Sequence, residues 1–343
     1  MKRKRGRPRG SKNKQRRPVI KITETNMERE GLYTSPSEES FKSVDTIKRE
    51  AFEKASVEIE ESLLPAELSF KELHDEAVRR ADFREKIEGE LRNVDIKIDS
   101  DRPIAIAWFS DTHVGNCGID YEKLRETAEV IKEHPLVYCI TGGDVTDSLF
   151  FDYGEEIMNM QEQYFYMYKM LGWIGAENIL AGVAGNHEQF SRKQGVSNYI
   201  NFTKELKRPL LRGTSFINLT VGKAEYKIML AHKFKGSSIY NPNHPQVRAG
   251  REVYGADIIM SAHNHRPGEA NIYQKEFGGG GKKITLIAGK TFKKYDAYGK
   301  DHGFHGMADD EIGCNYLILN HDKRLIRTAS STEEMLETMG QYL

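Results

Sequence analysis

The stretch IAIAWFSDTH, residues 104–113, joins an apolar run to an Asp and a His. Short apolar runs rich in branched and aromatic residues are typical of buried β-strands. Asp111 and His113 follow at the point where such a strand would end. A single Asp-x-His after a strand is weak evidence for a site, so the meaning of this stretch depends on how the other strands of the chain end.

Similar apolar runs follow along the chain. They lie at residues 136–140, 178–184, 225–232, 256–263, 283–289 and 314–320. Helical patterns separate the early runs, at 121–134 and 155–175. Strands that alternate with helices predict an α/β sheet covered on both faces, but periodicity alone does not distinguish one doubly wound sheet from two stacked sheets. Residues 266–312, which include GGGGKK, are expected to form long irregular loops.

Polar residues follow the carboxyl ends of five of these runs. They are Asp111 and His113, Asp144 and Asp147, Asn186 and His187, His232, and finally His263 and His265. Ligands of open α/β sheets bind at this edge, and carboxylate, imidazole and amide oxygen together suit divalent ions such as Mn, Fe or Zn. Each cluster alone has another explanation, because Gly-Asp and Gly-Asn favour turns and His232 could be a hydrogen-bonded core histidine. Their shared placement at strand ends favours a metal site.

The motifs and their order resemble the calcineurin-like metallophosphoesterase superfamily. They are D-x-H at 111–113, GD-x-x-D at 143–147, GNHE at 185–188, a lone His and H-x-H at 263–265, so the resemblance covers roughly 104–265. One departure is Ala262, where the family usually has Gly before the final H-x-H. The resemblance implies an α/β fold with two stacked mixed β-sheets flanked by helices, in four layers α/β/β/α.

The resemblance also implies two divalent metal ions, with manganese favoured and iron or zinc as alternatives. Asp144 would bridge the two ions. The implied ligands are Asp111, His113, Asp144 and His265 for one ion, and Asp144, Asn186, His232 and His263 for the other. Two ions that share a carboxylate clamp the attacking and leaving oxygens and lower the pKa of a bound water.

The resemblance assigns catalysis to His187 and Asp147. A metal-activated hydroxide would attack the phosphorus, and His187 would act as general acid toward the leaving oxygen. Asp147 would orient His187 and raise the pKa of its imidazole. We expect the neighbouring Glu188 to support the loop by hydrogen bonds and not to bind metal.

The charge of the chain is unevenly distributed, although the formal net charge is zero. Residues 1–18 contain ten Lys and Arg and no acidic residue, and the rest of the chain is net acidic. Arg5, Gly6, Arg7 and Pro8 resemble an AT-hook core, in which an Arg-Gly-Arg segment lies in the narrow minor groove of A·T-rich DNA. The alternative is a generic basic tail, which would still bind a polyanion. We therefore expect DNA as a partner.

Three hypotheses for the function fit these motifs. SDTHVG, GGDVTDS, GNHE and AHNH look similar to the catalytic motifs of SbcD-type DNA repair nucleases, which favours a phosphodiesterase acting on DNA, as exonuclease or endonuclease. The alternative is a phosphatase or phosphodiesterase for a small nucleotide or other phosphorylated molecule, which a lid formed by 266–312 would favour. The third hypothesis is a DNA-binding protein with a vestigial metal site, and the complete set of ligands argues against it.

Several basic residues near or after the later strands are candidates for DNA contacts. Each of them could instead be a solvated surface residue. They are Lys233, Lys235, Arg248, Arg251, Arg266, Lys290, Lys293 and Lys294. Contacts of this kind would make DNA binding dependent on salt.

Composition predicts several parts along the chain. We expect a disordered basic tail at 1–18, an acidic and partly helical linker at 19–64, a helical extension at 65–100, the catalytic domain at 101–330, and a C-terminal tail or short helix at 331–343. Apolar residues within 66–92 recur at steps of three or four, which indicates a helix. This helix would pack on the main domain or on a partner, including a second copy in a homodimer.

Cysteine usage and hydropathy predict the compartment. The chain has three cysteines and no CxxC motif, which favours reduced thiols in a cytosolic protein. The sequence shows no apolar segment typical of a signal peptide or long enough for a membrane span. We therefore expect a soluble, cytoplasmic protein without a membrane partner.

Overall fold

The computed structural model describes residues 19–23, 69–90, 93–148, 154–193, 206–275, 279–295, 303 and 306–342. They fall into two compact units, one formed by 19–23 with the described residues from 93 onward, and the other containing 69–90. The basic tail with Arg5, Gly6, Arg7 and Pro8 lies outside the described residues, as does the linker from 24 to 64.

The larger unit contains a six-stranded sheet in the order β13-β12-β3-β4-β5-β6. Strands β3 to β6 run parallel, and β12 and β13 extend the sheet with antiparallel pairing. The strands are β3 (Ile104–Phe109), β4 (Val137–Thr141), β5 (Ile179–Val183), β6 (Leu210–Leu211), β12 (Asn315–Leu319) and β13 (Ile326–Ala329). Every residue of β3, β4 and β5 is buried, which explains their continuous apolar sequences.

A second, seven-stranded sheet has the order β1-β2-β7-β8-β9-β11-β10. Its strands are β1 (Val19–Thr23), β2 (Asn93–Asp99), β7 (Ser215–Val221), β8 (Ala224–Leu230), β9 (Ile258–Ser261), β10 (Gly268–Lys275) and β11 (Gly281–Ala288). The parallel strands β8 and β9 are connected through helix α7 (His244–Glu252). Strands β10 and β11 form an antiparallel hairpin, with β10 at the edge of the sheet.

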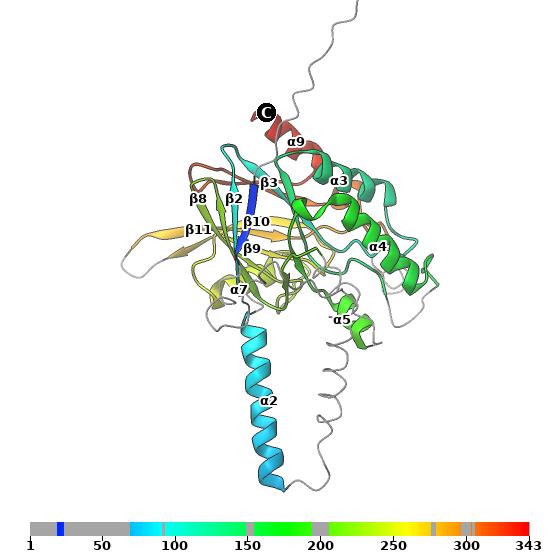
Figure 1. The fold of residues 1–343 in the computed structure, drawn as a ribbon. Coiled ribbons are helices and arrows are strands. Elements are labelled where there is room, and N and C mark those ends of the chain that lie inside the picture. Colours follow the sequence, from blue (N-terminus) through cyan, green and yellow to red (C-terminus); the bar gives the residue numbers. More distant parts are fainter. Residues whose placement is uncertain are drawn as a thin grey trace, which may run out of the picture. The chain divides into compact units, whose positions relative to one another are not determined.

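The two sheets stack face to face (Figure 1). Buried side chains from both sheets, among them Ile96, Trp108 and Leu230, form the core between them. Helices α3 (Tyr121–Glu133), α4 (Met160–Ile174) and α9 (Thr332–Gly340) cover the outer face of the six-stranded sheet. Helix α7 covers the outer face of the seven-stranded sheet. This α/β/β/α arrangement confirms the predicted fold class. It also shows that the strands form two stacked sheets, which periodicity alone had left open.

The helices on the six-stranded sheet begin at capping residues. Asp120 accepts a hydrogen bond from the backbone N–H of Lys123 and caps α3. Asn159 and Glu162 form a reciprocal capping box that starts α4, so this helix begins later than the predicted start at 155. The described elements of the larger unit also include three short helices, α5 (Asn186–Lys193), η1 (Ala176–Asn178) and η2 (Asp309–Glu311).

Six strands, β1, β2, β6, β7, β10 and β13, occupy segments in which the sequence analysis predicted none. Residues 93–99 lie in the expected helical extension but form β2, in which Val94, Ile96 and Ile98 face the core. Their alternation with polar residues is a strand pattern that the helical pattern before it obscured. Residues 19–23 lie in the expected linker but pair with β2 as strand β1.

The expectation of irregular loops over 266–312 was also wrong in part. Residues 268–275 form β10, an alternating strand with polar residues on one face, whereas β11 at 281–288 confirms the strand predicted at 283–289. The glycines between them made the segment look like a loop, but glycine with positive φ is what a turn between two strands requires. Gly279 and Gly280 both have positive φ. The hairpin therefore belongs to the sheet.

The smaller unit contains helix α2 (Phe70–Glu90), as the periodicity of 66–92 predicted. Ser69 and Glu72 cap it reciprocally, because the Glu72 carboxylate accepts from the Ser69 N–H at 2.8 Å and the Ser69 hydroxyl accepts from the Glu72 N–H at 3.4 Å. Phe70 and Val78 are exposed. A homodimer through this helix stays a prediction.

The cysteines are free thiols, with Cys139 and Cys314 buried and Cys117 exposed. Burial raises the pKa of the Cys139 thiol to about 12, which keeps it protonated and unreactive near neutral pH. Among the described residues, no helix combines the length and hydropathy needed to cross a membrane.

Replacing Trp108 by Phe should destabilise the larger unit. Trp108 is fully buried on β3, and its indole N–H donates to the Ser261 carbonyl on β9, in the other sheet, at 3.2 Å. Loss of this hydrogen bond and of ring volume should cost about 1–3 kcal/mol of unfolding free energy, measured by urea denaturation followed by circular dichroism. Trp173→Phe on α4 is the control, because Trp173 is 42% exposed. Equal losses in the two variants would contradict the prediction.

Candidate metal centre

The polar residues predicted at strand ends meet at one edge of the two sheets. Asp111 and His113 follow β3, Asp144 follows β4, and Asn186 begins α5 directly after β5. From the other sheet, His232 follows β8, and His263 and His265 follow β9. Parallel strands present their carboxyl ends at the same edge, so residues far apart in the sequence come together there.

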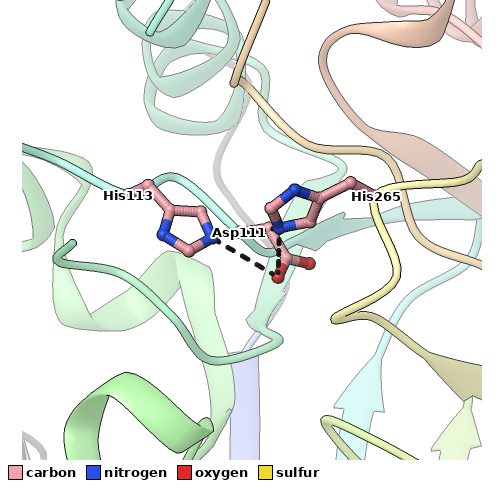
Figure 2. Close-up of side chains that lie close together, drawn as sticks. All are labelled: Asp111, His113 and His265. Carbon is pink, nitrogen blue, oxygen red and sulfur yellow. Dashed lines mark hydrogen bonds and ion pairs between the residues drawn. The ribbon is translucent and has the colours of Figure 1, made fainter. Parts of the chain in front are cut away.

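One group consists of Asp111, His113 and His265, whose ligand atoms lie within 4.8 Å of one another. The Nε2 atoms of His113 and His265 are 3.0 Å apart, and His265 Nε2 lies 3.3 Å from Asp111 Oδ1. Figure 2 shows both imidazole rings beside the Asp111 carboxylate. Two ring nitrogens at this separation need a proton or a cation between them, because two lone pairs repel.

A second group consists of Asp144, His232 and His263, again with ligand atoms within 4.8 Å of one another. His232 Nε2 lies 3.0 Å from Asp144 Oδ2 and 3.0 Å from Asn186 Oδ1. Asp144 also groups with His113 and His187 within the same limit. Asp144 is therefore the carboxylate that lies between the two sets of ligands.

The backbone is strained at this site. Five of the candidate ligands have left-handed φ angles, 49° at Asp111, 42° at His113, 50° at Asp144, 74° at His263 and 53° at His265. Such a conformation costs an L-residue with a side chain about 1–2 kcal/mol. Strained residues cluster at functional sites, where the surrounding structure holds them in place. The left-handed backbone therefore occurs at the same edge of the sheets as the clustered side chains.

Glu188 joins the loops after β4 and β5 by hydrogen bonds. Its carboxylate accepts from the backbone N–H groups of Asp144 at 2.9 Å, Val145 at 2.8 Å and Gly185 at 2.8 Å. In return, Asp144 Oδ1 accepts from the backbone N–H of His187 at 2.9 Å. The supporting role expected for Glu188 is thus confirmed.

Two glycines allow these loops to approach. A Cβ atom on Gly143, which has a φ of 92°, would lie 2.6 Å from the Gly185 nitrogen and 2.8 Å from His232 Nδ1. A Cβ on Gly185 would lie 2.5 Å from the Asp144 nitrogen. Only residues without a side chain fit at these two positions.

The electrostatics of the site favour bound cations. Burial alone would raise the pKa of Asp144, but the charge of His232 and the hydrogen bond from it hold that pKa well below its usual range. Burial lowers the pKa of the His232 imidazole, yet the Asp144 carboxylate outweighs burial and raises it to about 10. Chiefly because of burial, the pKa values of His113 and His263 fall to about 4. His113 and His263 are therefore in the neutral form that binds metals, whereas a metal ion at His232 would have to replace the proton on Nε2.

The donor atoms fit divalent metal ions. His113 and His232 use Nδ1 for hydrogen bonds, to the Asp147 carboxylate at 3.0 Å and to the Gly142 carbonyl at 2.8 Å. The Nε2 atom of each ring therefore points into the site, as in metal centres whose ligating histidines are oriented by an acceptor behind them. Carboxylates, imidazoles and an amide oxygen together suit Mn, Fe or Zn.

The position of Asp147 differs from the expectation. Its carboxylate contacts His113 Nδ1 at 3.0 Å and accepts from Asn116 Nδ2 at 2.9 Å. His187 Nδ1 instead contacts the backbone carbonyl of Asp147. The sequence spacing of Asp144 and Asp147 does not reveal this, because it leaves the direction of the side chain open. The expected orientation of His187 by the Asp147 carboxylate is therefore corrected to orientation by its backbone.

Two residues behind His113 have contacts that the sequence analysis missed, since it gave Asn116 no role and named Lys293 only as a candidate for DNA contact. Asn116 contacts Asp147 and also donates to Glu155 Oε2 at 3.4 Å. Lys293 Nζ lies 3.8 Å from Asp147 Oδ1, and Lys293 is only 5% exposed. No local sequence pattern distinguishes these residues, because they meet Asp147 only through the fold.

The basic residues that were candidates for DNA contacts differ in their exposure and in their partners. Lys290 and Lys293 are buried, so their assignment as surface contacts was wrong. Lys294 pairs with Asp120 at 2.8 Å. Lys233 is exposed, and its Nζ donates to His263 Nε2 at 2.8 Å at the rim of the centre. The others are Lys235, Arg248, Arg251 and Arg266, all exposed.

A family model supports the fold and the class of site. Residues 104–267 match the family model of the calcineurin-like phosphoesterases, a span that contains all of the candidate ligands. Similar solved structures include a metallophosphoesterase from Sphaerobacter thermophilus, at 12% identity and a TM-score of 0.33 over 69% of this chain and 95% of that one. The calcineurin-like phosphoesterase YfkN from Bacillus subtilis has 14% identity and a TM-score of 0.34 over 70% and 96%. No curated protein matches the chain.

Replacing Asp147 by Asn should weaken metal binding. The Asp147 carboxylate supports His113 through Nδ1, and loss of such a support lowers metal affinity about 10–100-fold. Calorimetric titration of the metal-free protein with Mn²⁺ measures this, with the exposed loop variant Asp322→Asn as control. If Asp147 acted on His187 alone, Asp147→Asn would bind Mn²⁺ as tightly as the parent protein.

Proposed function

We propose that the calcineurin-like metallophosphoesterase domain at residues 104–267 hydrolyses phosphodiester bonds, with DNA as substrate. The observation that carries the proposal is the convergence of the candidate ligands from two sheets around Asp144. A vestigial site would have lost at least one ligand, but every position holds a residue that can bind a metal. The strained backbone at five of these residues supports a site under functional constraint.

The proposed ligands form two sets that share Asp144. They are Asp111, His113, Asp144 and His265 for one divalent ion, and Asp144, Asn186, His232 and His263 for the other. Manganese is the favoured ion, with iron or zinc as alternatives. Two such ions, when bound, polarise the phosphate and lower the pKa of an attacking water.

His187 is the proposed general acid. Its Nδ1 contacts the Asp147 carbonyl, and its Nε2 lies 3.8 Å from Asp144 Oδ2, so Nε2 faces the centre. With Nδ1 donating to the carbonyl, a second proton on Nε2 is available to the leaving oxygen. His187 is 8% exposed, which limits competing proton exchange with water. Asp147 thus acts on both sides of the centre, through its backbone on His187 and through its carboxylate on His113.

Three features support DNA as the substrate. The basic segment 1–18 with its Arg-Gly-Arg-Pro sequence matches a polyanionic partner. Within 266–312, the segment considered as a lid over the metals, residues 268–275 and 281–288 are strands of the sheet. Exposed Lys233 and Arg266 directly follow the candidate ligands His232 and His265, at the rim of the centre.

The test uses the full chain with Mn²⁺ and two kinds of substrate, bis-p-nitrophenyl phosphate and end-labelled linear DNA. We expect hydrolysis of both, loss of both in EDTA, and recovery on adding Mn²⁺. His187→Ala should slow DNA cleavage about 100-fold or more. The loss should be smaller for bis-p-nitrophenyl phosphate, because nitrophenolate leaves without a proton.

The control is His74→Ala, which removes an exposed histidine on α2, and Mn²⁺ content is measured for each variant. Hydrolysis of the nitrophenyl ester without cleavage of DNA would overturn the nuclease assignment in favour of a small nucleotide or other phosphorylated molecule. Absence of both activities in the Mn²⁺-loaded protein would contradict the proposed function.

A further inference from the structure

Helix α7 presents one basic face to solvent. Its buried side includes Gln246 and Ala249, and Gln246 Nε2 donates to Ser261 Oγ at 2.8 Å and to the Ile287 carbonyl at 3.1 Å. His244, Arg248 and Arg251 are exposed. These three stand at i, i+4 and i+7, so they share one face of the helix.

Exposed tyrosines border this basic face at both ends. Tyr240 precedes the helix and is 90% exposed, and Tyr254 follows it and is 76% exposed. Tyr273 on the edge strand β10 is 74% exposed. A groove of about 420 Å³ lies between the end of α7 and β10, and its lining includes Arg251, Tyr254, Tyr273 and Lys275. Large aromatic surfaces left in water beside cations mark a binding surface.

The basic face begins at the metal centre. The chain leaves β8 through His232 and Lys233 and reaches α7 after Tyr240. Arg266, one residue after His265, donates from Nη1 to the Ile239 carbonyl at 3.4 Å. The Ser238 hydroxyl accepts from the Tyr240 N–H at 3.2 Å, which fixes the turn that carries this tyrosine.

The acidic residues near α7 leave its exposed face positive. Glu252 lies 3.3 Å from Arg248, at the C-terminal end of the helix. Asp257 is buried and is paired with Lys282 at 2.9 Å and Arg324 at 3.2 Å. Arg251 and the rim residues Lys233 and Arg266 therefore add to a surface that complements a polyanion.

We propose that a single strand of nucleic acid runs from the metal centre along α7 into the groove beside β10. The track consists of Tyr240, His244, Arg248, Arg251, Tyr254 and Tyr273, and we call it the α7 track. This inference rests on the proposed function, because it names the form of DNA that reaches the metals. Phosphates contact Arg248 and Arg251, and bases stack on the tyrosines.

A single strand fits the track better than a duplex. Aromatic side chains bind unpaired bases by stacking on their faces, and those faces are hidden inside a duplex. Cations that follow the backbone, interleaved with aromatic side chains, are the arrangement found in proteins that bind single strands. A surface that bound duplex phosphates would have no use for the exposed rings of Tyr254 and Tyr273.

The first test removes the two arginines together, as Arg248→Gln with Arg251→Gln in the full chain. Binding of a fluorescent oligothymidylate of about 20 nucleotides is followed by anisotropy in EDTA over a range of salt concentrations. Each lost phosphate contact lowers the slope of log K against log salt by about 0.7 for a single strand, so we expect a decrease of about 1.4. The double variant Arg125→Gln with Lys223→Gln, on exposed positions away from the track, should keep the parent slope.

The basic segment 1–18 is present in every variant, so its contribution to binding cancels in the comparison. An unchanged slope in the Arg248 and Arg251 variant would overturn the proposal.

The second test removes the stacking surfaces. Tyr254→Ala and Tyr273→Ala should each weaken single-strand binding about fivefold or more, whereas Tyr254→Phe should bind as the parent does. Phe165→Ala is the control, because Phe165 is 63% exposed on α4, outside the track. The assignment to a single strand would be overturned if the two alanine variants lost as much affinity for a duplex of the same length as for the single strand. It would also be overturned if they lost affinity for neither.

Hydrolysis of bis-p-nitrophenyl phosphate separates this inference from the proposed function. The track variants should hydrolyse it at the parent rate, because this small ester reaches only the metal centre, while cleavage of single-stranded DNA falls. If the parent chain hydrolyses the ester and the track variants cleave single strands normally, the track is wrong and the proposed function stands. If the parent chain hydrolyses neither substrate, the proposed function fails, and the track fails with it.

Discussion

The hydrogen bonds of the Glu188 carboxylate are the contact on which the metal centre depends. One side chain satisfies the backbone N–H groups of Asp144, Val145 and Gly185, so the loops that follow β4 and β5 are held together as one structure. Because Asp144 accepts in turn from the backbone of His187, the central carboxylate and the proposed general acid are positioned by the same contact. Gly143 and Gly185 are required for the same reason, since a Cβ atom at either position would separate the loops.

This arrangement has an electrostatic consequence. Asp111, Asp144 and Glu188 are all buried at this centre. Burial, together with the negative charge of Asp144, raises the pKa of the Glu188 carboxyl. Buried anions are stable only with compensating cations, and His232 supplies one such charge through its contact with Asp144. The remaining negative charge and the unprotonated imidazole nitrogens form a site that divalent ions would stabilise. The surrounding structure holds the left-handed backbone of five of the candidate ligands in place.

The sequence predicted this centre because its residues lie at the ends of regular strands, where local patterns determine position. Strand ends predicted that these residues would lie at one edge, and the resemblance supplied both their assignment as ligands and the two-sheet architecture that periodicity had left open. The side-chain direction of Asp147 was not predictable, since it depends on where His113 lies after folding. The burial of Lys293 has the same origin, because a lysine in a loop looks exposed until the loop packs behind the centre. Strand β2 was missed although it alternates correctly, because a helical pattern precedes it directly.

The connection between β8 and β9 explains why a recognition surface and the chemistry would lie together. Parallel neighbouring strands need a crossover, which here contains α7. The crossover starts after His232 and ends at β9, which is followed by His263. Two proposed ligands of the same ion therefore lie near the two ends of the crossover. Its inner face must pack on the sheet, which leaves the outer face free to carry charge without a cost to the core. Because the crossover is joined directly to His232 and to the strand before His263, a nucleic-acid strand bound along α7 would be positioned relative to the proposed metal ions by the fold itself.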